Sequence, residues 1–425
     1  MDKRSFIRNL GVMGAGLSAG FTRLREAVAA VEHIPASDLA AEEAFWLKVR
    51  GDYDIKPDYI NLENGYYCFL PRQTLENLID HMRTVNYEGS YYMRTVQFEN
   101  KNRVANAVAA IVGCSSDELA ITRNTTESLD LIIGGLDWQP GDEAVMAEQD
   151  YGAMLNHFKM VERRYGTVNR LVSVPNHPRS DEELVDLYAA AITDRTRLLM
   201  ISHMINITGQ VLPVRKIVDM AHARGVEVMV DGAHAYSHVP FQMSDLDCDY
   251  YGTSLHKWLS APLGSGMLYV KKEKIDSVWP LLAERDLGPN DMRRLNHIGT
   301  HPVHTDLAIL NAIEYQNTLG LERKAARLQY LQQYWTSRVR EMPGVIVNTP
   351  VELHRHGGIG NVGIDGLGPS ELADRLMNEH GIYTAAINRP GVQGVRVTPN
   401  VYTTTDELDV LVAAVEDLST KTVVL

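Results

Sequence analysis

The stretch YYGTSLHKWL, residues 250–259, places Lys257 just past a short predicted strand that runs from Cys248 to Tyr251. A second predicted strand, Val226 to Val230, runs directly into Asp231. A lysine taken alone is most often a solvated surface charge, since it is rarely buried without a partner. Here an apolar run punctuated by glycines follows the lysine, WLSAPLGSGMLYV. Such surroundings favour a desolvated amine, whose lowered pKa makes it a usable nucleophile.

An acid at one strand end and a lysine near another match what pyridoxal phosphate (PLP) requires. The lysine forms a Schiff base with the aldehyde, and Asp231 keeps the pyridine nitrogen protonated so that the ring can withdraw electrons. The phosphate needs N–H and hydroxyl donors, and the stretch RNTTESL at 123–129 follows a strand and opens a helix. Thr125 and Thr126 there also suit an ordinary helix cap, and both interpretations can hold together.

Composition narrows the function classes. The 425 residues are 45% hydrophobic, enough for a large core and two domains. The net charge of −13 comes from interspersed acids and bases without a basic patch, so we expect no nucleic-acid partner. No apolar run reaches the roughly 18 residues of a membrane span. The three cysteines have no zinc-site spacing, so we expect neither a metal site nor a disulfide scaffold.

The first 29 residues have the layout of an export signal. A basic run, Lys3 to Arg8, precedes a weakly hydrophobic segment from Leu10 to Phe21, and Ala27-Val28-Ala29 offers small residues for cleavage. The segment resembles a twin-arginine (Tat) leader, with Lys-Arg in place of Arg-Arg. This predicts export to the periplasm by the Tat machinery and a mature chain from about residue 30. The alternative is an amphipathic helix packed on the body of a cytoplasmic protein.

From about residue 61, predicted strands and helices alternate. Strands are predicted over 119–122, 144–147, 170–174, 197–202, 226–230 and 267–270, and helices near 126–134, 152–164, 181–192 and 214–224. The alternation predicts an α/β fold with a large, doubly wound and mostly parallel sheet over 61–300. Ligands of such sheets bind beyond the carboxyl ends of the strands, where Asp231 and Asn206 lie.

The ends of the chain have a different pattern. Residues 30–60 predict a helical segment with one helix over 38–50, and a short strand is predicted over 58–62. After residue 300 the pattern predicts a smaller α+β C-terminal domain, 301–425. Its expected elements are helices over 303–319, 321–341, 369–380 and 405–419, strands over 345–347 and 394–398, and an irregular glycine-rich stretch over 354–368.

The spacing of Asp231, His234 and Lys257 resembles the aminotransferase class V family of fold-type I PLP-dependent enzymes. Residues 230–235, VDGAHA, look like the family's aspartate motif, and residues 253–262, TSLHKWLSAP, look like its lysine motif. The His-Lys-Trp-Leu-x-Ala-Pro form is most similar to the isopenicillin N epimerase-like subgroup. The resemblance covers about residues 61–418 and implies a homodimer with shared active sites.

The resemblance also implies a role for each matching residue. Lys257 is the Schiff-base lysine and proton shuttle, Asp231 pairs with the pyridine nitrogen, and His234 bonds the phenolic oxygen of the ring. The remaining implied cofactor contacts are Asn206 at the same oxygen, Tyr151 on the ring face, and Thr125, Thr126, Ser254, His256 and a neighbouring subunit's Gly299-Thr300 at the phosphate. For the substrate, Arg396 matches the arginine that grips the α-carboxylate, and Asn64, Gly65 and Tyr66 match an entry strand. Each residue alone could serve packing or a turn.

The expected chemistry is removal of the Cα proton from a small, amino-acid-like substrate. Reprotonation at Cα epimerises, protonation on the cofactor transaminates, and loss of a Cβ group eliminates; the residues leave these branches open. Export would favour a peptide-like secondary metabolite in the periplasm as substrate. No cysteine follows Cys248, so the persulfide-forming loop cysteine of cysteine desulfurases is missing, and we expect the chain not to be one. A PLP-binding sensor without turnover and a Schiff-base enzyme without PLP stay open beside these readings.

Overall fold

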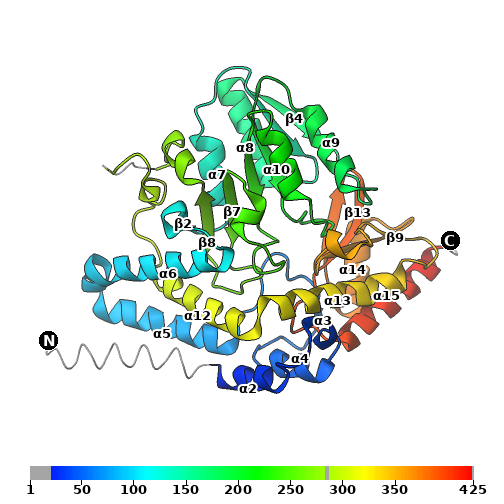
Figure 1. Ribbon diagram of the computed structural model, residues 1–425. Helices are drawn as coiled ribbons and strands as arrows, with labels where there is room; N and C mark the ends of the chain where they lie inside the picture. Colours follow the sequence, from blue (N-terminus) through cyan, green and yellow to red (C-terminus); the bar gives the residue numbers. More distant parts are fainter. Residues whose placement is uncertain (1–20, 283–286, 424–425) are drawn as a thin grey trace.

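The large sheet of the computed structural model has seven strands in the order β2-β8-β7-β6-β5-β3-β4 (Figure 1). Residues 21–282 and 287–423 are described. The strands are β2 (Leu119–Thr122), β3 (Glu143–Ala147), β4 (Val168–Val172), β5 (Thr196–Ser202), β6 (Glu227–Asp231), β7 (Tyr250–Ser254) and β8 (Gly266–Val270). The ladders from β4 through β7 are parallel, and β8 runs antiparallel to both of its neighbours. The predicted mostly parallel, doubly wound sheet is confirmed.

Helices cover both faces of this sheet. On β3 and β5 successive side chains alternate between two apolar clusters: Val145 and Leu199 join one, Ala144 and Leu198 the other. The first cluster lies under helices α6 (Gln97–Val112), α9 (Asp181–Ala191) and α10 (Val214–His222), and the second under α7 (Thr125–Gly135) and α8 (Gly152–Tyr165). Burial on both faces explains why these strands are apolar throughout.

The N-terminal helices are α2 (Thr22–Ala30), α3 (Ala36–Leu39) and α4 (Glu43–Arg50), so the single helix predicted over 38–50 is wrong: the chain turns between α3 and α4. Helix α2 packs on the body, because Leu24 is 2% exposed and the Phe21 ring meets that of Tyr315 at 5.2 Å. Residues 1–20 of the predicted leader lie outside the described residues. Its remainder forms this packed helix.

Three long helices lie side by side at the base of the molecule (Figure 1): α5 (Arg72–Glu88), α6 and α12 (His304–Leu319). A π-helical turn, Tyr92–Val96, leads from α5 into α6. Helix α12 packs against both others, and α13 (Leu321–Val339) continues toward the C-terminal sheet. The predicted long pair is thus present, whereas α5 was not predicted.

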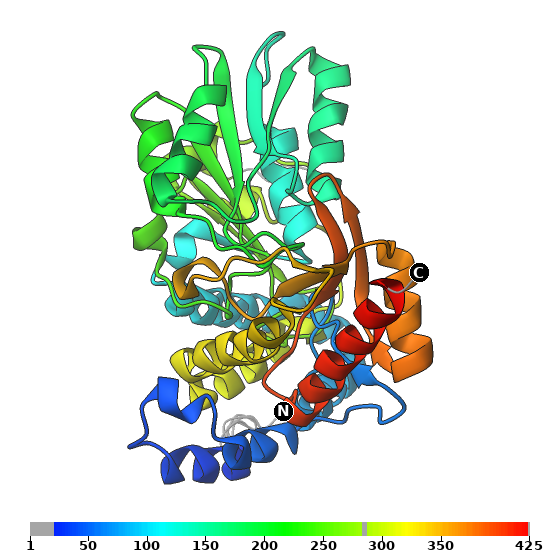
Figure 2. The same ribbon diagram turned by 90° about the vertical axis from the view of Figure 1, so that its right-hand side faces the viewer.

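The C-terminal sheet is antiparallel, with the order β12-β13-β10-β9, and α14 (Pro369–His380) and α15 (Thr405–Val423) lie beside it (Figure 2). Its strands are β9 (Val345–Val347), β10 (Gly360–Ile364), β12 (Ala385–Arg389) and β13 (Val392–Val397). Strand β10 lies where the sequence predicted an irregular stretch. A short parallel pair, β1 (Ile60–Asn61) with β11 (Ile382–Tyr383), ties residues before the large sheet to this domain. Across the described ranges no helix is both long and apolar enough to cross a membrane.

The two sheets approach each other where the functional residues gather. Strands β2, β3, β5, β6 and β7 run in the same direction, so their carboxyl ends share one edge of the large sheet. On the other side Glu63 forms a β-bridge with Thr398, just past β13. The candidate site therefore lies between the strand ends and the start of the C-terminal domain.

Candidate active site

Lys257 lies three residues beyond the end of β7, and its amine faces a histidine. Its Nζ lies 3.0 Å from Nε2 of His234, which follows the end of β6 by three residues. Burial lowers the pKa of Lys257 to about 8, and the nearby Asp231 carboxylate opposes that shift. Burial also holds the pKa of His234 well below its usual range, and the neighbouring Lys257 adds to the effect. The predicted lysine and histidine are therefore brought together.

Trp258 fixes how His234 presents its ring. The indole Nε1–H donates to Nδ1 of His234 at 3.3 Å, so Nδ1 carries no proton. The proton of the neutral imidazole is then on Nε2, which points at the lysine. An Nε2–H can bond the lone pair of an uncharged amine, whereas an ammonium has three donors and no acceptor. The geometry therefore selects a neutral, nucleophilic Lys257.

Asp231 ends β6 and is 6% exposed. Its Oδ1 accepts from the N–H of Ala233 at 2.9 Å, and within the described ranges no hydrogen bond to Oδ2 is present. Burial raises the pKa of Asp231, and the proximity of Lys257 lowers it. Asp150 lies nearby, and burial raises its pKa to about 7. A buried carboxylate with a free oxygen suits a cationic partner such as a protonated pyridine nitrogen.

The start of α7 meets the end of β7. Thr125 donates its N–H to Oγ of Ser254 at 2.8 Å, and the two hydroxyls lie 2.7 Å apart. Neither the N–H nor the hydroxyl of Thr126 bonds another group in the described part of the chain, and buried Nδ1 of His256 also lacks a partner there. Thr125 and Thr126 lie at the N-terminus of α7, where free N–H groups and the helix dipole favour an anion. They offer a cradle for the predicted phosphate.

Arg396, on β13, reaches the same region from the C-terminal domain. Its guanidinium pairs with the carboxylate of Glu63, 2.5 Å between Nη2 and Oε1, and Nη1 donates to the carbonyl oxygen of Asn206 at 3.2 Å. The nearby Arg396 cation also lowers the pKa of Lys257 and of His234. Glu63 was not among the residues predicted from the sequence, although it directly precedes Asn64-Gly65.

Four other predicted residues lie in different situations. Asn64 is fully buried, with its amide bonded to the Thr398 carbonyl at 2.7 Å and accepting from the Tyr402 hydroxyl at 2.7 Å. Its side chain is already engaged, which argues against the predicted contact with substrate. Tyr66 is 76% exposed, and Tyr151, which directly precedes α8, is 45% exposed. Thr300 is exposed outside this cluster, so its predicted phosphate contact with a second subunit stays a prediction.

A cysteine also lies beside the lysine. The N–H of Cys68 donates to the carbonyl of His256 at 3.2 Å. Its thiol contacts the Asn64 carbonyl at 3.2 Å and the Asn400 amide at 3.1 Å. Burial raises the thiol pKa to about 12. Such a cysteine was expected only in the C-terminal half of the sequence.

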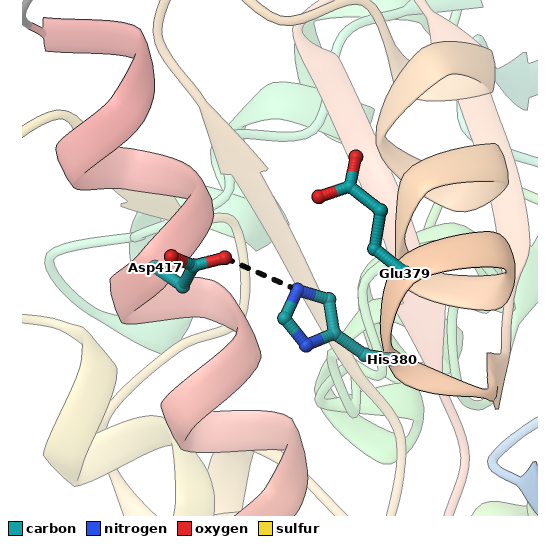
Figure 3. Close-up of side chains that lie close together, drawn as sticks. All are labelled: Glu379, His380 and Asp417. Atoms are coloured by element: carbon teal, nitrogen blue, oxygen red, sulfur yellow. Dashed lines mark ion pairs between the residues drawn. The ribbon is translucent and has the colours of Figure 1, made fainter.

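A separate acidic cluster lies on the C-terminal domain, where Glu379 and His380 of α14 face Asp417 of α15 (Figure 3). His380 Nε2 lies 3.4 Å from Asp417, which also pairs with Lys421 at 2.6 Å. Glu379 pairs with Arg375 at 2.7 Å. Because both acids have cationic partners, a metal ion would have to displace them, and the cluster serves to join the two helices.

Comparisons with known proteins agree with this arrangement. The model of a family described as aminotransferase class-V matches residues 70–411. Isopenicillin N epimerase of Streptomyces clavuligerus is 27% identical over 393 residues, covering 88% of this chain and 99% of that protein. A cysteine desulfurase of Haloferax volcanii is 27% identical over 398 residues, covering 86% and 90%. A solved C-DES variant with glycine linked to its PLP cofactor covers 87% of this chain and 99% of its own, with a TM-score of 0.78 at 22% identity.

The comparisons confirm the expected fold-type I architecture and the resemblance to isopenicillin N epimerases. They also show that the prediction that this chain is not a cysteine desulfurase is wrong. Cysteine desulfurases recur among the relatives, at 27–28% identity, so a missing C-terminal cysteine does not separate this chain from them. The prediction failed because it rested on the position of a single cysteine in the sequence.

The gathered residues fit PLP. Asp231 has a free oxygen for the pyridine nitrogen, Nε2–H of His234 can bond the ring oxygen, and Lys257 offers an uncharged amine to the aldehyde. The orphaned Nδ1 of His256 and the free Thr126 N–H suit the phosphate. The site therefore has a matching group for each polar part of the cofactor.

Proposed function

Because this chain belongs to the aminotransferase class V family, we propose that it is an enzyme that acts at Cα of an amino-acid-like substrate. Its cofactor is pyridoxal 5′-phosphate. When bound, the cofactor supplies an electron sink that makes the Cα proton of an attached amine acidic. The observation that carries the proposal is the buried Lys257 amine with a lowered pKa, held 3.0 Å from His234 beside Asp231 and Arg396.

Each of the four site residues has a separate proposed role in this reaction. Lys257, whose pKa is lowered to about 8, accepts the Cα proton in its uncharged form and can return it. His234, with its proton on Nε2, orients the lysine in the free enzyme and is placed to hold the ring oxygen. Asp231 keeps a negative charge in a buried place where a pyridine cation needs one. Arg396 orients the substrate through its α-carboxylate.

Epimerisation at Cα is the first outcome that we propose, supported by the isopenicillin N epimerases, which match almost over their full length. Transamination requires the same proton removal and stays an alternative outcome. A second candidate is cleavage of a Cβ–S bond by β-elimination or desulfuration. It is supported by the cysteine desulfurase relatives and by Cys68 beside the lysine peptide.

A panel of amino acids and amino-acid-like peptides in deuterated buffer tests the proposal. Epimerisation incorporates deuterium at Cα with inversion, transamination yields a keto acid without free ammonia, and β-elimination yields a keto acid together with ammonia and the Cβ leaving group, which is sulfide for a thiol substrate. Borohydride reduction and peptide mapping should find the cofactor on Lys257 and not on the buried Lys324. Deuterium exchange absent from every substrate, with Lys257 modified, would contradict the enzyme proposal and favour a sensor.

Two further proposals concern the setting of the enzyme. We propose a homodimer, supported by the exposed Thr300 and by exposed aromatic residues where α5 passes into α6, Tyr87, Tyr91 and Phe98.

We also propose Tat-dependent export to the periplasm, supported by the basic run Lys3 to Arg8. A peptide-like secondary metabolite is then the substrate class to test first. Cytoplasmic retention of a Lys3→Gln, Arg4→Gln variant, with export of the parent chain, is the expected result.

A further inference from the structure

The carboxylate of Glu63 already pairs with Arg396, the arginine that the proposed function assigns to the substrate's carboxylate. Nε of Arg396 donates to Oε2 of Glu63 at 3.2 Å, and Nη2 donates to Oε1 at 2.5 Å. The two side chains are 9% and 6% exposed. Nη1 donates to the carbonyl oxygen of Asn206. Every nitrogen of the guanidinium has a protein partner, and Glu63 holds an edge that suits bidentate binding of a carboxylate.

The backbone around Glu63 supports this pairing and leads to the surface. A Cβ atom on Gly65 would lie 2.8 Å from Cζ of Arg396, so the glycine lets the guanidinium lie against the chain. The N–H of Tyr66 donates to Oε1 of Glu63 at 2.9 Å. Tyr66 itself is 76% exposed. The acid is therefore held by a short segment that reaches from the site to solvent.

We propose that Glu63 is a specificity-determining gate that occupies the substrate's place on Arg396 and leaves when a carboxylate substrate binds. This inference rests on the proposed function, which assigns Arg396 to the substrate. Two carboxylates cannot share one guanidinium edge, and their like charges repel in a buried place. Displacing Glu63 consumes part of the binding energy, so free α-amino acids bind weakly. A larger substrate, such as a peptide-like amino acid, supplies the difference through contacts elsewhere.

Acetate is a probe of Arg396 that does not react with the cofactor. In cofactor-loaded protein at constant ionic strength, Glu63→Gln should lower the acetate dissociation constant at least about tenfold in an NMR titration, because the carboxylate competitor is gone. Methylammonium, a matched probe without a carboxylate, should not bind more tightly. Adding Arg396→Ala to Glu63→Gln should abolish the gain in acetate affinity.

Glu143→Gln is the matched control, because the Glu143 side chain is equally buried and also pairs with an arginine through two nitrogens, the half-exposed Arg170, at the start of β3. It should leave acetate binding unchanged. If folded Glu63→Gln protein binds acetate no better than the parent, the gate is overturned. Weaker methylammonium binding with unchanged acetate binding would instead assign Glu63 to a substrate cation.

If Glu63→Gln fails to fold, the Glu63→Asp variant tests the gate in its place. It keeps the charge but is one methylene too short to pair with both nitrogens, so it should bind acetate more tightly than the parent, and unchanged affinity overturns the gate. In the parent protein, saturating acetate should speed hydrogen exchange of the Tyr66 amide, since its acceptor leaves. Persistent protection with acetate bound would contradict displacement. Failure of the proposed function would appear separately, as absence of the cofactor from Lys257 after borohydride reduction.

Discussion

At the scale of single residues, burial sets the protonation of the candidate nucleophile. Lys257 loses hydration among apolar neighbours, and the Asp231 carboxylate recovers only part of that loss, so its pKa is lowered to about 8. His234 stays neutral for the same reason. The amine is therefore largely uncharged at mildly alkaline pH without a strong base beside it.

The rate of cofactor rebinding should follow this pKa. In protein stripped of PLP, the uncharged fraction of Lys257 rises about tenfold from pH 7 to pH 9 and then levels off, and the rebinding rate should do the same. The folded pKa lies below that of the unfolded chain, so the cost of burying the ammonium is present below pH 8 and is relieved as the pH rises. Stopped-flow absorbance measures the rate. A continued steep rise above pH 9 would indicate an ordinary lysine pKa.

Trp258 provides a second test at this scale. Trp258→Phe keeps an aromatic ring but removes the N–H that holds Nδ1 of His234 as an acceptor. The midpoint of the rebinding profile should then rise by about 0.7 pH unit, since one hydrogen bond is worth about 1 kcal/mol. Trp335→Phe is the control, because that indole is buried but its Nε1 has no hydrogen-bond partner among the described residues. Equal profiles for both variants would contradict the assignment of the His234 proton to Nε2.

At the scale of elements, the sequence predicted those parts whose pattern is local. Apolar runs such as Leu198–Ile201 gave the parallel strands, and the strand ends then placed Asp231 near Lys257. The prediction of an irregular stretch over 354–368 failed because a glycine there serves packing. A Cβ on Gly360 would lie 2.5 Å from the Trp335 ring, so β10 needs a glycine at this position of the strand. The pairing of Glu63 with Arg396 joins residues 333 positions apart, and no local pattern could show it.

Helix α2 is the element whose status can be tested most directly. Removing residues 1–29 deletes buried Phe21, Leu24 and Ala27 and the 2.6 Å ion pair between Arg25 and Glu314. Full burial of one phenylalanine and one leucine stabilises by about 3–6 kcal/mol, so the truncated protein should lose about that much free energy of unfolding. Removing residues 1–20 deletes none of these contacts and is the matched control. Equal denaturation midpoints for the two truncations would show that α2 contributes nothing to the stability of the body.

At the scale of the whole molecule, the site lies between two units that the chain joins several times. Strand β1 pairs with β11, and the backbone of Glu63 forms a β-bridge with that of Thr398. Asn64 lies buried between the same segments. A substrate that moved Glu63 would therefore act at the contact between the two sheets, and this contact is where we expect the structural response to binding.

The proposed homodimer gives the last test. Tyr87 and Tyr91 are 91% and 65% exposed beside the turn into α6, an unusual exposure for aromatic residues unless a partner covers them. Replacing both with arginine should halve the mass measured by light scattering and weaken PLP binding, because Thr300 of the second subunit would be lost from the phosphate. Leu171→Arg is the control, since Leu171 is 52% exposed on the edge strand β4, away from α5 and α6 (Figure 1). A parent protein that is already monomeric, or a double variant of unchanged mass, would contradict this interface.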